Sequence, residues 1–357
     1  FLIQIQKAAK VGVNPEAYKK FSESQIGYIL GDTGRSFVVG VGVNPPVHPH
    51  HRASSCPNEP VLCDYSAMTN PGPNPHILTG AVVGGPDKSD AYADKRDDYV
   101  HNEVAMDYNA AFQGTLAALL HLNAKFNGKP IDIGPVATVW PITVSPVGPK
   151  GNYNYGAVIH ASLLFYEAQR SGKLPANKRV HWRGDSMLDD GKDVGKDLTG
   201  GYFDAGDLVK FGFPMAFTMT VLSWSLVDYE DAYEKAGELE NVRNAIKWGT
   251  DYFLKCHTSD TEFYGQVGNG NEDHAVWGRP EDWPKTKKIR PAYKVTSAHG
   301  GSELTGETSA ALTAASLAFA KSDPTYSATL LTHAKSLYAF ADKYRANYTI
   351  EIPDVKS

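Results

Sequence analysis

Helical periodicity dominates this chain and is the feature that most restricts its fold. Apolar residues recur at a spacing near 3.6 in most of the sequence. The helical segments are Phe1–Lys10, Asn14–Leu30, Glu103–Leu122, Tyr153–Ser171, Pro214–Glu230, Leu239–His257, Glu307–Lys321 and Pro324–Arg345. The β-rich runs, Ser36–Val41 and Ala137–Val144, are short and bounded by Gly or Pro. We therefore predict an all-α protein with about eight helices.

Long connections rich in Gly, Pro, His and Asp separate the helices, at about 31–100, 172–213 and 258–306. Connections in compact proteins usually have only a few residues, and much longer ones are commonly functional. We expect the chemistry of the protein in these loops. Residues 123–152 differ, because they hold five prolines, almost no charge and no helical period. They are typical of a linker, with a β-rich loop packed on one domain as the alternative.

Charge and hydropathy exclude two classes of partner. The formal net charge is −5 and no block of Lys or Arg occurs, which argues against binding nucleic acid through its phosphates. No apolar run approaches the roughly 20 residues that cross a bilayer. The chain opens on Phe1 without an initiator Met or an obvious secretory signal, so we expect a mature piece or a fragment.

Two features concern the compartment of the protein. Cys56 and Cys63 lie close together in a Pro-rich loop, and either a disulfide or two free thiols fits this spacing. A bridge would favour an oxidising, extracellular setting. The glycosylation triplet at residues 347–349 points the same way.

The stretch "GGYFDAGDLVK", residues 200–210, sets Asp204 and Asp207 three residues apart between glycines. Glycine frees the backbone for a tight turn, so both carboxylates can converge on one point and activate a water as general base. A polar turn or a helix cap is the alternative.

The stretch "NPPVHPHHR" presents His48, His50, His51 and Arg52 on a loop stiffened by proline. These side chains suit either a metal ion or a hydrogen-bonded polar ligand. The lack of a nearby Cys or carboxylate partner argues against a zinc site.

Two further stretches carry candidate residues. Glu103, predicted in the first turn of a helix, follows a carboxylate-rich run with Asp94, and such crowding raises a carboxyl pKa toward that of a proton donor. A surface residue favoured by the helix dipole is the alternative. The stretch "GQVGNGNEDHAVWGRPEDW" offers His274, Trp277 and Trp283, and aromatic rings with polar neighbours suit either a sugar ring or a core.

These stretches carry a resemblance to a known family. Residues 36–52, "SFVVGVGVNPPVHPHHR", and 92–110, "YADKRDDYVHNEVAMDYNA", resemble the two signature motifs of glycoside hydrolase family nine, the inverting endo-β-1,4-glucanases. Residues 153–175, 197–216 and 263–282 resemble the amino-terminal half of that family in its invertebrate cellulase form. The resemblance covers nearly the whole chain except the Pro-rich stretch.

The resemblance implies an (α/α)6 barrel with a glucan-binding cleft at one end. It implies that Asp207 is the base, that Asp204 positions the attacking water, and that Glu103 protonates the leaving oxygen. An inverting pair needs room for a water, with carboxyls roughly 6.5–9.5 Å apart. The resemblance also implies substrate contacts, at His50, Arg52, Asp94, Tyr108, His274 and Trp277. No cofactor is required for the reaction.

The chain departs from the family in order and in length. Residues 1–123 resemble the carboxy-terminal part of a module, 124–151 form the linker, and 152–357 resemble the amino-terminal part. About eight of the barrel's twelve helices are present. The structural calcium of the family has its ligands in the missing middle, so no metal-binding residue is assigned here.

Two histories explain this order. In a fragment of a tandem polypeptide, which is the simpler explanation, Glu103 and Asp207 belong to different sites; in a circular permutant they face each other. We expect a secreted endo-β-1,4-glucanase acting on β-1,4-glucan, with lichenan-type glucans as alternative substrates. A non-catalytic remnant that at most binds glucan is the alternative function. The oligomeric state stays open.

Overall fold

A computed structural model describes residues 15–122, 153–352 and 354. Long helices form its main body, and each coincides with a segment predicted from periodicity. They are α2 (Pro15–Leu30), α6 (Met106–Leu122), α7 (Tyr155–Ala168), α8 (Gly212–Lys235), α9 (Leu239–Cys256), α11 (Ser302–Phe319) and α12 (Pro324–Lys343). The predicted helix Phe1–Lys10, the β-rich run Ala137–Val144 and the linker 124–151 lie outside the described residues.

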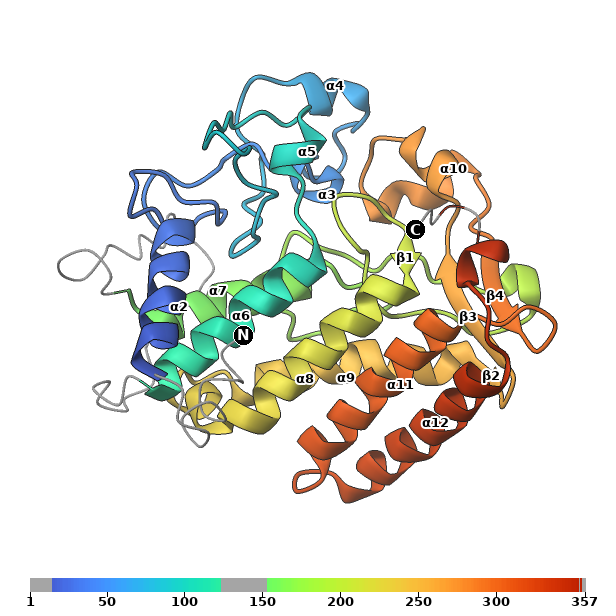
Figure 1. The fold of residues 1–357 in the computed structure, drawn as a ribbon. Helices are drawn as coiled ribbons and strands as arrows, with labels where there is room; N and C mark the ends of the chain where they lie inside the picture. Colours follow the sequence, from blue (N-terminus) through green and yellow to red (C-terminus); the bar gives the residue numbers. More distant parts are fainter. Residues whose placement is uncertain (1–14, 123–152, 353, 355–357) are drawn as a thin grey trace.

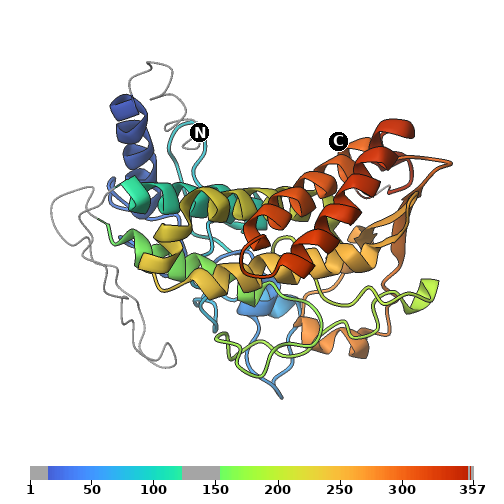
Figure 2. The same ribbon diagram turned by 90° about the horizontal axis from the view of Figure 1, so that it is seen from below.

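The long helices pack in two layers (Figures 1 and 2). α6, α8 and α11 lie side by side at the front of Figure 1 with α12 beside α11, whereas α7 and α9 lie behind them. α8 packs against α6, α9 and α11. One apolar core joins the two described ranges of the chain, since it contains Leu116 from the first range together with Ile159 and Leu222 from the second.

Three predicted boundaries differ from the structure. α6 begins at Met106, so the prediction that Glu103 lies in its first turn is wrong. Glu103 pairs with His50 in an isolated bridge, which keeps the backbone extended there. α11 begins at Ser302, earlier than predicted, and α8 runs on to Lys235 across a non-helical Tyr229.

A small antiparallel sheet was missed by the sequence reasoning. Its strands are β1 (Lys210–Phe211), β2 (His257–Ser259), β3 (Glu262–Val267) and β4 (Ala292–Thr296). β3 is central and pairs with the other three. The register Lys210↔Val267 joins the end of the "DAGD" loop to the loop that carries His274. The predicted β-rich run at 36–41 forms only isolated bridges from Val38, to Val41 and Val82.

Short helices gather at one end of the long ones, along the upper edge of Figure 1. They are α3 (Arg52–Ser55), α4 (Tyr65–Thr69), α5 (Tyr99–Asn102) and α10 (Gly270–His274). In the described part of the chain, 3-10 turns occur at Lys192–Val194, Pro280–Thr286 and Tyr348–Ile350. Within the described ranges, none of the helices has the length and apolarity to span a membrane.

Candidate active site

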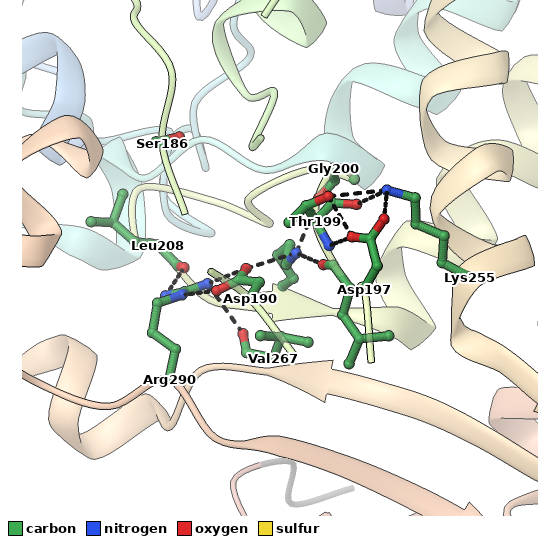
Figure 3. Close-up of polar contacts among 12 residues, drawn as sticks. Ser186, Asp190, Asp197, Thr199, Gly200, Leu208, Lys255, Val267 and Arg290 are labelled. Carbon is green, nitrogen blue, oxygen red and sulfur yellow. Dashed lines mark hydrogen bonds and ion pairs between the residues drawn. The ribbon is translucent and has the colours of Figure 1, made fainter. Parts of the chain in front are cut away.

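Buried ion pairs hold both ends of the "DAGD" loop (Figure 3). Asp190 accepts a hydrogen bond from Arg290 Nε at 2.7 Å and lies 2.8 Å from Lys210 Nζ. Lys210 Nζ also donates to the carbonyl oxygen of Gly200 at 3.0 Å, and Arg290 Nη1 donates to that of Leu208 at 2.8 Å. The three charged side chains, which we call the loop anchor, therefore fix where the loop starts and where it ends.

At Gly206 the loop contacts the stretch around Arg52 and the stretch around Glu103. The N–H of Gly206 donates to Glu103 Oε1 at 3.1 Å, and its carbonyl accepts from the N–H of Arg52 at 3.1 Å. A Cβ at this position would lie 2.1 Å from the carbonyl oxygen of His50, so only glycine allows this approach. Glu103 thus binds the residue next to Asp207. The carboxyls of Glu103 and Asp207 therefore lie in one site. This arrangement is expected if the two parts of the chain, 1–123 and 152–357, close on each other. A tandem fragment would have them in separate sites.

The carboxyls in this site are crowded and partly desolvated. Burial, and then the neighbouring Asp207, raise the pKa of Glu103 to about 7. Burial and Asp207 also raise the pKa of Asp204 well above its ordinary value, and the pKa of Asp273 in the same direction. Low-dielectric surroundings and like charges both favour the protonated form. The site can therefore hold a proton on Glu103 near neutral pH beside a second carboxyl, the arrangement of a general acid and a general base.

Asp207 and Asp273 share the positive groups of the site. His274 Nε2 lies 3.3 Å from Asp207 Oδ2, and the buried Arg52 pairs with the fully buried Asp273. The Oδ1 atoms of Asp204, Asp207 and Asp273 are buried and accept no hydrogen bond from the described residues. Buried polar atoms without protein partners commonly mark where water or a ligand binds. We call Glu103 and these three aspartates the carboxylate cluster.

Asp273 is the member of the cluster that the sequence reasoning missed. Its signal was weak, because "NEDH" presents four polar residues in a row and only the fold shows which of them is buried. Glu272, its neighbour, has an exposed side chain paired with Lys288, whereas Asp273 turns inward to Arg52.

Trp277, which was predicted to contact the substrate, is buried in the structure. Trp277 is only 4% exposed, and its Nε1 donates to Ser55 Oγ at 2.9 Å. The rings of His50 and Trp277 meet edge to face at 5.1 Å, and the Arg52 guanidinium lies over the indole at 5.7 Å. Trp277 therefore packs against the His50 ring and the Arg52 guanidinium, as a core residue would. Trp283 is also buried.

Exposed aromatic side chains near the cluster are tyrosines. Tyr108 is 45% exposed, and burial of the rest of the side chain, followed by Asp107 and Glu103, raises its pKa. The Tyr65 hydroxyl donates to the carbonyl oxygen of His274. These rings, rather than Trp277, offer apolar faces to a ligand at the site.

Other predicted residues hold the His-rich loop in place. Asp94 accepts hydrogen bonds from the N–H of Val47 at 2.9 Å and from that of His48 at 3.1 Å, and also contacts the His48 ring. His51 caps α3 and contacts Gln169, and burial lowers its pKa to about 3. Asp94 and His51 are thus anchors, and His50 and Arg52 are the residues of this loop that reach the cluster.

Two further features border the site. Cys56 and Cys63 form a disulfide, which closes the loop between α3 and α4. Among the described residues, Asp207, Asp273 and His274 bring potential metal ligands within 4.8 Å of one another. Because Arg52 already neutralises Asp273 there, the positive charge that the group needs is present, and we assign no metal to it.

The fold and the site together define a class: an all-α protein of the (α/α)6-barrel type with a carboxylate cluster where its loops meet. The family model described as "Glycosyl hydrolase family 9" matches residues 1–116 and 155–357, and the chain belongs to this family.

Named relatives match only part of their own length. "Endoglucanase A" of Bacillus pumilus is 56% identical over 198 residues, which are 56% of this chain and 30% of the relative. "Endoglucanase 7" of Oryza sativa subsp. japonica is 55% identical over 57% of this chain, and the match covers 38% of that relative. The solved endoglucanase of the termite Nasutitermes takasagoensis is 60% identical, with a TM-score of 0.55. The match covers 57% of this chain and 46% of the termite chain. The chain thus spans less than half the length of these relatives.

Proposed function

We propose that the protein is an endo-β-1,4-glucanase that hydrolyses internal bonds of cellulose-like glucans with inversion. The contact of Glu103 with Gly206, next to Asp207, carries this proposal, because it joins a proton donor and a base in one site. The names of the relatives support the substrate class. So does the cellulase Cel9M of C. cellulolyticum, solved in complex with cellobiose, which is 40% identical with a TM-score of 0.52.

In the proposed reaction Asp207 takes a proton from a water molecule. The water oxygen bonds to the anomeric carbon while the bond from that carbon to the leaving oxygen breaks, and Glu103 donates its proton to that oxygen. Asp204, held protonated, would hydrogen-bond the same water. Proton exchange with solvent then returns Asp207 and Glu103 to their starting states.

Substrate contacts in this proposal come from side chains around the cluster. His50 and Arg52 present donors beside it, and His274, bonded to Asp207, is more than half exposed. Tyr108 offers a ring face for a sugar. Asp94 and Trp277 act by holding the His-rich loop and its side chains rather than by touching sugar.

The test is release of reducing sugar from carboxymethyl cellulose by this chain. Glu103→Gln removes the proton donor and should lower kcat about 10²- to 10⁴-fold. Glu240→Gln, on the exposed side of α9, is the matched control and should leave the rate unchanged. Lichenan in parallel assays would reveal the mixed-linkage alternative. A folded sample that binds glucan but hydrolyses none would favour the remnant, a reading that the short span of the chain supports.

Three further proposals accompany this one. The Cys56–Cys63 disulfide supports a secreted protein, since such bonds persist in oxidising compartments. We propose that the reaction needs no cofactor and that any structural calcium would bind outside this chain. We also propose that 1–123 and 152–357 correspond to the carboxy-terminal and amino-terminal parts of a family-nine module, joined by the linker 124–151.

A further inference from the structure

Arg170, which follows the end of α7, is a buried arginine without a negative partner among the described residues. Its side chain is buried, and its Nε atom has no hydrogen-bond partner in that part of the chain. The other buried arginines of the described ranges each have a carboxylate or carbonyl acceptor, namely Arg52, Arg96, Arg183, Arg279 and Arg290. Because buried charges in proteins are normally paired, the exception at Arg170 calls for a partner from outside the chain.

The groups that do contact Arg170 are neutral. Its guanidinium carbon lies 4.8 Å from the ring centroid of Trp248 on α9. Attraction to an aromatic ring leaves the N–H donors of the guanidinium without acceptors. Arg170 also acts on the hydroxyl of Tyr202, but burial raises the pKa of Tyr202 to about 12, against the opposing effect of Arg170. This hydroxyl therefore stays protonated at neutral pH and cannot balance the positive charge.

Arg170 lines a hollow between the end of α7, the chain at 175–179 and α9, two helices that pack side by side in the rear layer (Figure 2). The hollow has a volume of about 430 Å³. Ligand pockets typically have roughly 300–1,000 Å³, so a small molecule fits. The charged side chains of the lining are Glu167, Arg170, Lys178, Arg179, Lys247 and Asp251. We call this site the rear hollow.

The carboxylates of the rear hollow are already engaged. Arg179 Nε donates to Glu167 Oε1 at 2.6 Å, and Lys247 Nζ donates to Asp251 Oδ1 at 2.7 Å. The remaining charges are those of Arg170 and half-buried Lys178, and both are positive. The chain as a whole has a formal net charge of −5, so the positive charge of the hollow is a local property.

We infer that the rear hollow binds an anion through its oxygen atoms, with Arg170 as the main ligand-binding residue and Lys178 as the second. A guanidinium matches the geometry of carboxylate, phosphate and sulfate groups, which accept two of its hydrogen bonds at once. The side-chain amides of the lining add further donors, at Asn177, Asn241 and Asn244. The lining contains no member of the carboxylate cluster, so the inference does not rest on the proposed hydrolysis.

Trp248 provides an optical signal for the same event. Its ring contacts Arg170, and its Nε1 donates to the carbonyl oxygen of Gly201 at 2.9 Å. An anion that binds the guanidinium changes the charge next to the indole. Anion binding should therefore change the tryptophan fluorescence, and Trp248→Phe should remove that change.

The test is calorimetric titration of the full chain with two probes, sodium glucuronate and sodium phosphate, at an ionic strength held constant with sodium chloride. Each probe represents one source of the oxygen atoms, a carboxylate on a sugar or a free inorganic anion. Binding of either probe at one site supports the inference, and the probe that binds more tightly identifies the source. Glucose, which lacks the carboxylate of glucuronate, should not bind at this site.

Variants assign the binding to the rear hollow. Arg170→Gln removes the charge-assisted hydrogen bonds and should weaken binding about 10- to 100-fold. Arg243→Gln is the matched control, because Arg243 is a cation of α9 that pairs with Glu230 and Glu240 outside the hollow, and it should bind like the unchanged protein. Lys178→Glu, which places a carboxylate in the hollow, is the second variant if Arg170→Gln does not fold, and it should abolish binding.

Three outcomes would overturn the inference. The first is no binding of either probe at about 10 mM, which lies beyond the usual range of specific affinities. The second is equal binding by the folded Arg170 or Lys178 variant and by the unchanged protein. The third is glucose binding as tightly as glucuronate, with the same loss in Arg170→Gln, because the hollow would then be a site for a neutral sugar.

Discussion

Two clusters of buried charge meet at the "DAGD" loop, and they differ in their balance of positive and negative groups. In the loop anchor one carboxylate, Asp190, faces two cations, Lys210 and Arg290. In the carboxylate cluster four carboxyls share the charge of Arg52 and His274. The excess of cations in the loop anchor favours the ionised form of Asp190. The excess of carboxyls in the carboxylate cluster favours keeping some of them protonated.

The difference in balance separates positioning from chemistry. Burial opposes the ionisation of Asp190, but Lys210 and Arg290 outweigh it and lower its pKa. In the carboxylate cluster burial and like charge act together and raise the pKa of Glu103. A cluster with an excess of cations keeps its carboxylate ionised and fixes the backbone, whereas a cluster with an excess of carboxyls keeps protons that a reaction can use.

The strongest way to break the comparison is to remove the carboxylate of the loop anchor. Asp190→Asn leaves two buried cations without their carboxylate, and removal of one partner from a buried ion pair costs about 3–5 kcal/mol. The free energy of unfolding from urea titration should fall by that amount. Asp189→Asn is the matched control, because Asp189 pairs with Lys192 at the surface, and its effect should stay below about 1 kcal/mol. Equal losses in the two variants would show that the anchor is not a stabilising unit.

The opposite sign is expected for Glu103. Its folded pKa is about 7 and its ordinary value 4.5, so the folded protein keeps a proton that the unfolded chain has lost. The contribution of Glu103 to stability therefore falls as pH rises from about 4.5 to 7, by about 3 kcal/mol at 1.36 kcal/mol per unit. Glu103→Gln should match the unchanged protein at pH 4 and exceed it in stability at pH 8. A difference that does not depend on pH would contradict the raised pKa.

Much of the helical layer could be predicted from sequence, and the site only in part. The helices follow from periodicity because their buried stripes repeat regularly, as in α9 (Leu239–Cys256). The sheet around β3 was missed because its strands are short and depend on pairing across the chain. Asp273 was missed for a related reason, because its buried partner, Arg52, is 221 residues away in the sequence.

The roles of Asp94 and Trp277 show the limit of motif reasoning. Their residue types suit sugar binding, yet Asp94 accepts hydrogen bonds from the His-rich loop and Trp277 is buried beneath His50. A motif identifies which residues gather at a site. Which of them face the ligand depends on packing, and the packing is set by segments far away in the sequence, such as the loop around Gly206.

A smaller loss of stability is expected for Asp273→Asn. Asparagine can still accept a hydrogen bond from Arg52, and an oxygen of Asp207 lies within 4.8 Å of the carboxyl at position 273, so a negative charge stays near the cation. The free energy of unfolding at pH 7 should fall by about 1–2 kcal/mol, as for a buried hydrogen bond weakened from charged to neutral. Glu272→Gln, next in sequence but exposed, is the control and should change it by less than about 1 kcal/mol. A loss as large as that of Asp190→Asn would mean that Asp207 does not compensate Arg52.

The smallest effect concerns His274, which is at the exposed edge of the carboxylate cluster. The hydrogen bond to Asp207 raises its pKa, against the opposing effect of burial. Protonated His274 therefore stabilises the folded state below about pH 6.5, and this contribution disappears as pH rises through the raised folded value. Because the side chain is 59% exposed, His274→Gln should cost less than about 1 kcal/mol at pH 6 and nothing at pH 9. An NMR titration of His274 checks the cause directly: Asp207→Asn should return its pKa toward about 6.5, and an unchanged pKa would assign the shift to some other group.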